Sequence, residues 1–305
     1  MLTPGTWHRL PVTTPTLFVD ADPSLETLGL DVDDDLALLF LLGSPEVALR
    51  GVTTVFGNSW GALTHLSARR TLRNAGRGDV PVVRGADAPR DAAGARRAGE
   101  ALSRSVRAHP GATLLALGPL TNVAAAADDP GFGACLGALV VMGGRLRSGE
   151  SDFNVRQDPA AAARVLALSC PKTFVTLDLG LGIAITPGDA DVLTRDPTSA
   201  VSRRRGSLRR HARVQNAWRA LRGRTLGEAR GGFHPWDVLA AAAVTHPGLF
   251  ELAAASIAFD ALGRTHLGRA DGAAVSMTAS VDANVFRALF LSRIAAPRLG
   301  NGPRA

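Results

Sequence analysis

The sequence has no tyrosine, one lysine and two cysteines in 305 residues. The lack of tyrosine excludes acid catalysis by a phenol. The lone lysine, Lys172, follows a proline, so the phosphate-binding loop GxxxxGK(S/T) is absent. Neither an HExxH zinc motif nor a CxxC redox motif occurs. Two cysteines are too few for a disulfide scaffold and are typical of a reducing compartment, so we expect a cytoplasmic protein.

Positive charge is in excess, with 34 Lys and Arg against 27 Asp and Glu and a net charge of +7. A nucleic-acid-binding surface would gather these arginines in one stripe, with aromatic residues interleaved. The arginines are instead spread from Arg9 to Arg304 without such aromatic platforms, so we expect no nucleic-acid partner. No apolar run reaches the roughly 18 residues of a membrane span, and the first residues lack a secretory signal, so we expect no membrane association.

Apolar runs typical of buried strands alternate with Ala- and Leu-rich stretches typical of helices. This alternation predicts an α/β fold with a mostly parallel central sheet and helices on both faces. We expect a single domain over residues 1–305, with an Arg-rich helical excursion at 188–232. Expected strands lie at 16–22, 47–58, 80–86, 113–120, 138–144, 172–178 and 273–281, with another before the turn at Gly263; expected helices lie at 34–44, 60–76, 96–109, 234–246 and 281–294.

Acidic and amide side chains follow the expected strands. Because the carboxyl ends of parallel strands meet at one edge of a sheet, we expect at least four carboxylates and two amides to converge there. A helix cap needs only one oxygen, whereas several buried carboxylates repel one another unless a cation neutralises them. Oxygen-only ligands suit Ca²⁺ or Mg²⁺ rather than Zn²⁺. Six aspartates lie within 16 residues, namely Asp20, Asp22, Asp31, Asp33, Asp34 and Asp35, and the other candidates are Asn58, Asp152, Asn154 and Asp237.

The motifs FVDAD, DVDDDLALLFLLGSPE and GVTTVFGN resemble the N-terminal region of the inosine–uridine-preferring nucleoside hydrolases. The similarity continues through ALGPLTNVA, VVMGG, DFNVRQDPAAA, HPWDVLAAA and VDANVFRALFLSRI, in the family's order and over nearly the whole chain. The resemblance implies the nucleoside hydrolase fold, built around a Rossmann-like core. It also implies calcium-dependent hydrolysis of the N-glycosidic bond of ribonucleosides to free base and ribose, by a homo-oligomer (dimer or tetramer).

The resemblance assigns a role to each candidate residue. Asp33 would be the general base that activates water. Calcium would be held by Asp22, Asp34, Asp237 and the backbone carbonyl of Leu117. Substrate would be bound by Asn58, Asn154, Asp152 (at the 5′ end, where the family usually has glutamate) and Trp236, which would stack on the base as in the purine-preferring branch.

Several residues depart from the family pattern. Residues 23–32 form an insertion that either bulges outward or lets Asp31 replace Asp22 as metal ligand. An HGxDG-like loop after the third strand is missing, and Asp35 stands where a small residue is usual. Trp236 either stacks on a base or packs in the core, whereas for Trp60 we expect core packing.

Two other functions remain open on the sequence. The departures from the family pattern are also compatible with a degenerate relative that holds a ribosyl ligand without hydrolysing it. The run Asp20–Ala21–Asp22 after an apolar strand also resembles a Mg²⁺-dependent phosphatase of the haloacid dehalogenase type. That class needs a lysine further along, and Lys172 begins an expected strand instead.

Overall fold

A mixed sheet forms the centre of the computed structural model, which describes residues 14–24, 32–204, 206, 208–210 and 233–297. Its strands are β1 (Thr16–Ala21), β2 (Ala48–Thr54), β3 (Val82–Arg84), β4 (Ala112–Ala116), β5 (Leu136–Met142), β6 (Lys172–Val175), β7 (Phe250–Phe259), β8 (Thr265–Leu267) and β9 (Ala273–Val281). Within the described residues their order is β3-β2-β1-β4-β5-β6-β9-β7-β8. Neighbours are parallel from β3 to β9, and only β7 pairs antiparallel, with β9 and β8. The expected mostly parallel sheet is confirmed.

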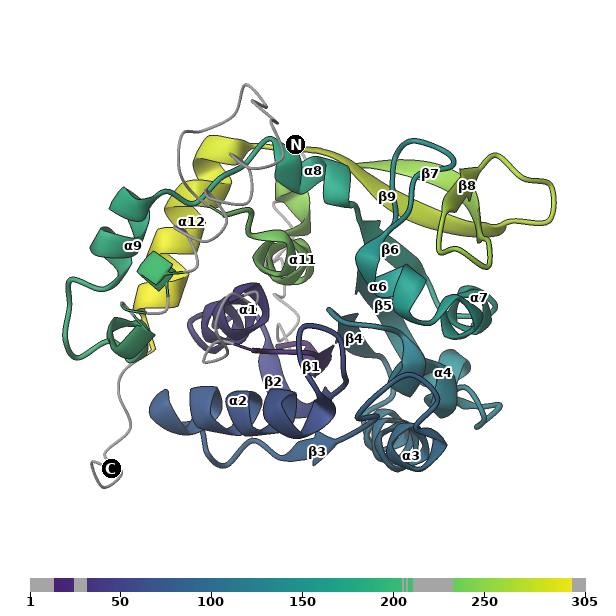
Figure 1. The fold of residues 1–305 in the computed structure, drawn as a ribbon, viewed down its shortest axis with the longest axis horizontal. Helices are drawn as coiled ribbons and strands as arrows, with labels where there is room; N and C mark the ends of the chain where they lie inside the picture. Colours follow the sequence, from purple (N-terminus) through teal and green to yellow (C-terminus); the bar gives the residue numbers. More distant parts are fainter. Residues whose placement is uncertain (1–13, 25–31, 205, 207, 211–232, 298–305) are drawn as a thin grey trace, which may run out of the picture.

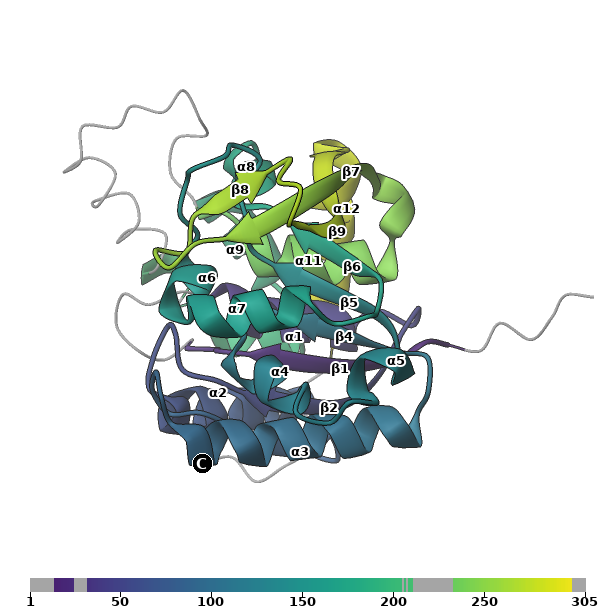
Figure 2. The ribbon, with the colours of Figure 1, turned by 90° about the vertical axis from the view of Figure 1, so that its right-hand side faces the viewer.

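Helices cover both faces of this sheet, as expected (Figures 1 and 2). One face is packed by α1 (Asp33–Leu42), α2 (Gly61–Asn74), α11 (Trp236–Thr245) and α12 (Ala283–Ala295). The other face is packed by α3 (Ala92–Ala108), α4 (Thr121–Ala126), α5 (Phe132–Cys135) and α7 (Pro159–Leu166). Shorter helices follow strands or lie at the margin: α6 (Phe153–Gln157), α8 (Leu177–Leu181), α9 (Pro187–Leu193) and the 3₁₀ turns Ala200–Arg204 and Pro247–Leu249.

The side chains of β1 show how one sequence supplies two cores. Successive residues of a strand point to opposite faces. Leu17 and Val19 accordingly join the core under α1, whereas Phe18 joins the core under α3 and α4. Helix α1 is apolar all round after its first turn and is buried from Asp33 to Leu41, as expected for a helix surrounded by other elements.

Strands β1 to β6 all end before the residues that the sequence predicts, and for two of them this matters for the site. β4 stops at Ala116 rather than at residue 120, and β5 stops at Met142 rather than at residue 144. The chain turns away at Gly143 and Gly144, whose φ angles of 155° and 81° favour glycine. The residues freed from the two strands form loops at the carboxyl edge of the sheet.

Some sequence predictions fall on residues outside the described ranges. Of the helical excursion expected at 188–232, the described part contains most of α9 and the 3₁₀ turn Ala200–Arg204, whereas 211–232 lie outside. Asp31 and residues 25–31 of the expected insertion also lie outside the described residues. The single-domain assignment stays a prediction.

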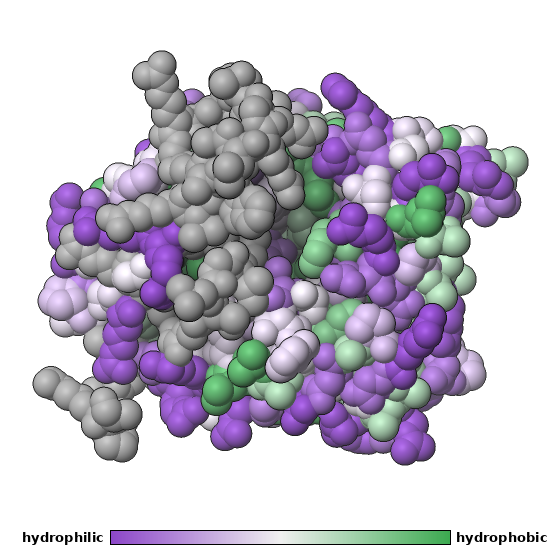
Figure 3. Space-filling view, viewed as in Figure 1, coloured by the Kyte–Doolittle hydropathy of each residue, from purple (hydrophilic) through white to green (hydrophobic). Residues whose placement is uncertain are grey.

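On the face seen in Figure 3, hydrophilic residues are spread widely rather than gathered in one stripe. Several surface arginines pair with aspartates close by in sequence, as Arg77 does with Asp79 and Arg269 with Asp271. Much of the positive charge is therefore balanced locally. Among the described helices, none combines the length and the apolar character that crossing a bilayer requires.

Candidate active site

A hollow of about 280 Å³ lies at the carboxyl edge of the parallel strands. Open α/β sheets bind their ligands at this edge. Eight of the nine residues to which the family resemblance assigns a role line this hollow. The ninth, Asp34, is hydrogen-bonded to two of those eight. The lining consists of Asp22, Asp33, Asn58, Leu117, Met142, Asp152, Phe153, Asn154, Leu177, Trp236 and Asp237.

The loops after β1 and β2 are joined through Asp34, near the start of α1. The backbone N–H of Asp22 donates to Oδ1 of Asp34 at 2.9 Å. Asn58 donates twice, from its backbone N–H to Oδ2 of Asp22 at 2.6 Å and from Nδ2 to Oδ2 of Asp34 at 3.0 Å. These contacts hold two buried carboxylates and one amide in a fixed arrangement beside the hollow.

Two glycines make room for the Asp22 carboxylate. A Cβ atom at Gly57 would lie 2.1 Å from its Oδ2, and a Cβ at Gly118 would lie 2.5 Å from its Oδ1. Gly57 also has φ of 151°, which other residues rarely adopt. No side chain larger than hydrogen therefore fits at either position while Asp22 keeps its place.

Asp33 and Asp237 come from helices whose first residues meet. The backbone N–H of Asp237 donates to Oδ2 of Asp33 at 3.0 Å, across 204 positions of sequence. Both carboxylates line the hollow, and both are buried. The N-termini of α1 and α11 place partial positive charge beside them.

A third side of the hollow comes from the loops after β4 and β5. Nδ2 of Asn154 donates to the carbonyl oxygen of Leu117 at 2.6 Å. Asp152 caps α6 by accepting from the backbone N–H of Val155 at 2.8 Å. Burial raises the pKa of Asp152 to about 6, although the nearby backbone amides oppose that rise.

The remaining wall is aromatic and apolar. Trp236 is half-buried, and it both packs against the core of α1 and lines the hollow. Its indole N–H donates to the carbonyl oxygen of Leu177 at 3.0 Å, and its ring lies 5.0 Å from the ring of His234, centroid to centroid. Trp236 therefore packs against the core and also lines the hollow, and its stacking on a base stays a prediction.

Sequence reasoning missed three lining residues and misplaced one. Met142, Phe153 and Leu177 carry no chemical motif, and only their positions at strand or helix ends could have indicated them. The core packing expected for Trp60 is wrong: its side chain is 77 % exposed, because the residue that precedes α2 lies outside the helix face that packs on the sheet.

Residues 57–61, GNSWG, also match the GxSxG pattern of serine hydrolases, but Ser59 does not line the hollow.

Two other aspartates of the N-terminal run face away from the hollow. Oδ1 of Asp20 accepts hydrogen bonds from Thr53 and Asn122, inside the fold, and burial raises its pKa to about 7. Asp35 accepts hydrogen bonds from Ser67 and Thr71 of α2.

A phosphatase of the haloacid dehalogenase type would need an accessible Asp20 with a lysine beside it. Asp20 is fully buried and lines no part of the hollow. Nζ of Lys172 donates to the backbone carbonyls of Leu168 and Cys170, at the amino end of β6 and so at the opposite edge of the sheet. The geometry argues against that reading.

The donor set bears on whether a metal fits. Apart from Trp236, the polar side chains that line the hollow in the described residues are those of Asp and Asn, whose oxygens suit a hard cation such as Ca²⁺. Gly57 and Gly118 let the Asp22 carboxylate lie directly against the backbone at this edge of the hollow. In the described part of the chain, however, no three His, Cys, Asp or Glu side chains are grouped closely enough to hold a metal as they stand. The residues therefore fit a hard cation in kind, and ligation requires small movements of the carboxylates.

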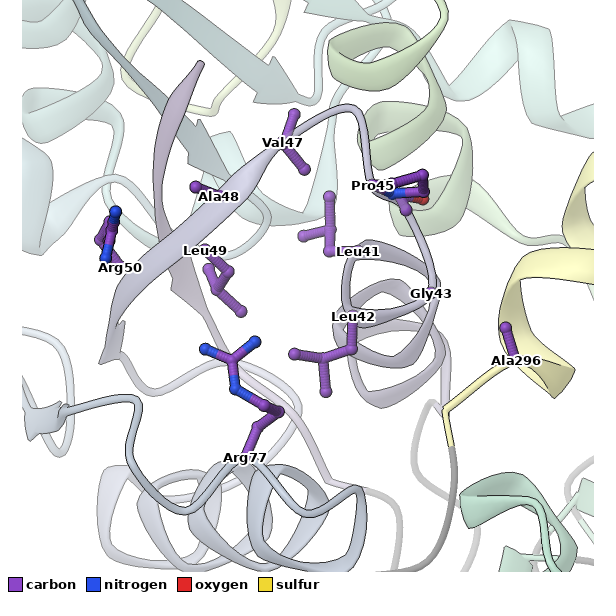
Figure 4. Close-up of a pocket in the computed structure, with 11 residues that line it drawn as sticks. Leu41, Leu42, Gly43, Pro45, Val47, Ala48, Leu49, Arg50, Arg77 and Ala296 are labelled. Atoms are coloured by element: carbon purple, nitrogen blue, oxygen red, sulfur yellow. The ribbon is translucent and has the colours of Figure 1, made fainter. Parts of the chain in front are cut away.

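Another hollow, of about 490 Å³, lies at the opposite edge of the sheet, between the end of α1 and the start of β2 (Figure 4). Its walls include Leu42, Leu49 and Arg77, which approach one another in Figure 4, and none of the described residues in its lining is acidic. None of the candidate residues reaches it, so the chemistry is concentrated at the carboxyl edge.

Comparison with known proteins identifies the class. The family model described as inosine-uridine preferring nucleoside hydrolase matches residues 17–288. The chain belongs to this family, and the resemblance inferred from the motifs is confirmed.

Individual relatives are moderately similar. The chain is 30 % identical to probable uridine nucleosidase 2 of Arabidopsis thaliana over 58 % of this chain and 63 % of that protein, so it spans less than two thirds of that relative. It is 28 % identical to the non-specific ribonucleoside hydrolase RihC of Escherichia coli over 84 % of this chain and 85 % of that protein.

Solved structures share the fold. The plant nucleoside hydrolase PpNRh1 superposes with a TM-score of 0.78 and 22 % identity, covering 93 % of this chain and 100 % of that one. The purine-preferring ribonucleoside hydrolase from Gardnerella vaginalis superposes with a TM-score of 0.80 and 22 % identity, covering 92 % and 98 %. The expected fold class is confirmed.

Proposed function

We propose that the protein hydrolyses the N-glycosidic bond of ribonucleosides to free base and ribose. The observation that carries this proposal is that one hollow is lined both by carboxylate and amide side chains and by the indole of Trp236 with apolar neighbours. Asp22, Asp33, Asn58, Asn154 and Asp237 would face a sugar, and Trp236 with its apolar neighbours would face a base. Relatives named as uridine nucleosidases and ribonucleoside hydrolases support the same activity.

The proposed chemistry suits these residues. Cleavage of an N-glycosidic bond passes through a ribosyl cation with positive charge near C1′, as in other glycoside hydrolyses. Asp33, oriented by the amide of Asp237, takes the proton of the attacking water. The neighbouring carboxylates stabilise the cationic sugar electrostatically, and Asn58 and Asn154 position its hydroxyls.

We propose Ca²⁺ as the cofactor, held by Asp22, Asp34, Asp237 and the carbonyl oxygen of Leu117. When bound, it would orient the water and the sugar hydroxyls and lower the pKa of the water. Asp22 and Asp34 are already joined by a hydrogen bond, which supports their acting as a pair.

The test is ribose release from inosine, adenosine and uridine. We expect turnover with Ca²⁺, loss of turnover on chelation, and recovery when Ca²⁺ is restored. Nucleoside binding without release of reducing sugar would instead support the alternative of a non-catalytic ribosyl-binding relative.

Variants then separate the base from the metal ligands. Asp33→Asn should lower turnover by about 10²–10⁴-fold while Ca²⁺ binding, followed by calorimetry, is kept. Asp34→Asn should weaken Ca²⁺ binding and turnover together. If Asp33→Asn keeps its turnover and Asp22→Asn loses turnover with Ca²⁺ still bound, Asp22 is the base instead.

The cellular setting is also a proposal. We propose a cytoplasmic homo-oligomer, a dimer or tetramer, that releases bases from nucleosides for salvage, purines included. The free thiols of Cys135 and Cys170 support a reducing compartment. Light scattering of the purified protein tests the oligomeric state.

A further inference from the structure

Gly180 in α8 lies directly against the indole of Trp236. A Cβ atom at Gly180 would be 2.1 Å from Cδ1 and 2.2 Å from Nε1 of Trp236. Contacts that short do not occur between real Cβ atoms and side chains, so any residue larger than glycine must displace the ring. Gly180 is buried and its φ is not in the left-handed region, so space rather than backbone conformation requires glycine here.

The indole is held on this surface by more than packing. Its N–H donates to the carbonyl oxygen of Leu177, three residues before Gly180 in the same helix. His234 packs against the indole with an interplanar angle of 42°, and Nδ1 of His234 is 2.7 Å from the carbonyl oxygen of Ile183. Residues 177–183 therefore fix both the position and the orientation of the Trp236 indole, directly through Leu177 and indirectly through His234.

We propose that Gly180 determines the affinity of the site for the base, by letting the indole of Trp236 lie against α8 and so keeping the part of the hollow beside the indole open. This inference rests on the proposed function, because it takes that part of the hollow as the base subsite. Gly180 does not line the hollow and acts only through Trp236, so it is a positioning residue. A residue with a Cβ at position 180 would push the ring toward the space that the base occupies.

The chain offers a matched control two residues away. Gly182 ends α8, and among the described residues the only atom that a Cβ there would approach within 4 Å is the carbonyl oxygen of Leu179, at 3.9 Å. Gly180→Ala and Gly182→Ala thus add the same methyl group near the same helix end, but only the first meets Trp236. Gly182→Ala should leave base and sugar binding within about twofold of the unsubstituted protein.

The experiment measures binding of the two halves of a nucleoside separately, by NMR titration of the full chain with adenine and with ribose, each with Ca²⁺ present. Stacking of a base on an aromatic ring is worth about tenfold or more in affinity. Gly180→Ala should weaken adenine binding by about tenfold and leave ribose binding within about twofold. Equal weakening of both ligands, or no weakening of either, would overturn the proposal.

A second measurement guards against a general folding defect. In the Trp236→Ala background there is no ring to displace, so adding Gly180→Ala should change the thermal midpoint far less than it does in the unsubstituted protein. An undiminished effect in that background would contradict a role through Trp236. Neither measurement needs turnover: a protein that releases no ribose yet shows the adenine-selective loss would refute the hydrolase proposal and keep this one.

Discussion

The carboxyl group of Asp152 is buried, caps α6 and lines the hollow. Burial raises its pKa from 3.8 to about 6. The folded protein therefore holds this proton more tightly than the unfolded chain does. Below about pH 4 the carboxyl group is protonated in both the folded and the unfolded state and does not change the free energy of unfolding. As the pH rises from about 4 to about 6, the unfolded state loses its proton first and the free energy of unfolding falls. Above about pH 6 the free energy of unfolding stays lower by about 3 kcal/mol.

Asp152→Asn keeps the cap and removes the ionisation. We expect it to be more stable than the unsubstituted protein above pH 6, with the advantage shrinking toward zero near pH 4, in urea denaturation measured from pH 4 to 8. Asp152→Ala should lose the same pH dependence but be less stable than Asp152→Asn at every pH by about 1 kcal/mol, because it loses the cap. Parallel profiles for Asp152→Asn and the unsubstituted protein would contradict the assignment.

Helix α1 begins with three consecutive aspartates, and helical geometry sends them in three directions. Successive residues of an α-helix are about 100° apart around its axis. Asp33 accepts from α11, Asp34 accepts from the loops after β1 and β2, and Asp35 accepts from Ser67 and Thr71 of α2. One turn of helix thereby ties together three neighbouring elements around the site.

Asp35→Ala tests the tie between α1 and α2. It would remove the acceptor that two buried hydroxyl groups share, so we expect the free energy of unfolding to fall by about 2–4 kcal/mol. Asp35→Asn keeps an acceptor oxygen and should lose less. Chemical denaturation measures both, and an Asp35→Ala variant as stable as the unsubstituted protein would show that the tie is not stabilising.

The positions of the helices and strands could be predicted from the sequence, because apolar runs and their spacing indicate which segments are buried. The direction in which each side chain points was harder to predict. Reading the six N-terminal aspartates as one crowded group was too simple: strand alternation turns Asp20 away from the hollow, and helical rotation turns Asp35 toward α2. The packing contact between Trp236 and Gly180 joins residues 56 positions apart, and no local pattern in the sequence indicates such a contact.

At the scale of the whole molecule, the last helix completes the core that the first helix begins. Phe286, Phe290 and Ile294 of α12 are fully buried in the core that also contains α1. Where α1 ends, Arg293 donates to the carbonyl oxygen of Gly43 at 3.3 Å and pairs with Glu46. The first and last helices of the described chain are thus joined at the edge of the sheet opposite the site.

Gly43→Ala tests this junction. A Cβ atom at Gly43 would lie 2.0 Å from the backbone oxygen of Arg293, so α12 or the end of α1 must move. We expect the free energy of unfolding to fall by about 1–3 kcal/mol, as for other overpacked sites, in urea denaturation followed by circular dichroism. Gly248→Ala, where a Cβ would meet no atom of the described residues within 4 Å, should change the free energy of unfolding by less than about 0.5 kcal/mol.

The same variant shows whether the junction and the site are independent. Asp33 lies at the other end of α1, about 15 Å from Gly43 along a ten-residue helix. If α1 is held separately at its two ends, Gly43→Ala should keep the Ca²⁺ affinity and the rate of ribose release within about twofold at temperatures well below its unfolding midpoint. A parallel loss of stability and Ca²⁺ affinity would mean instead that α12 helps to position the carboxylates, through a shift of the whole helix.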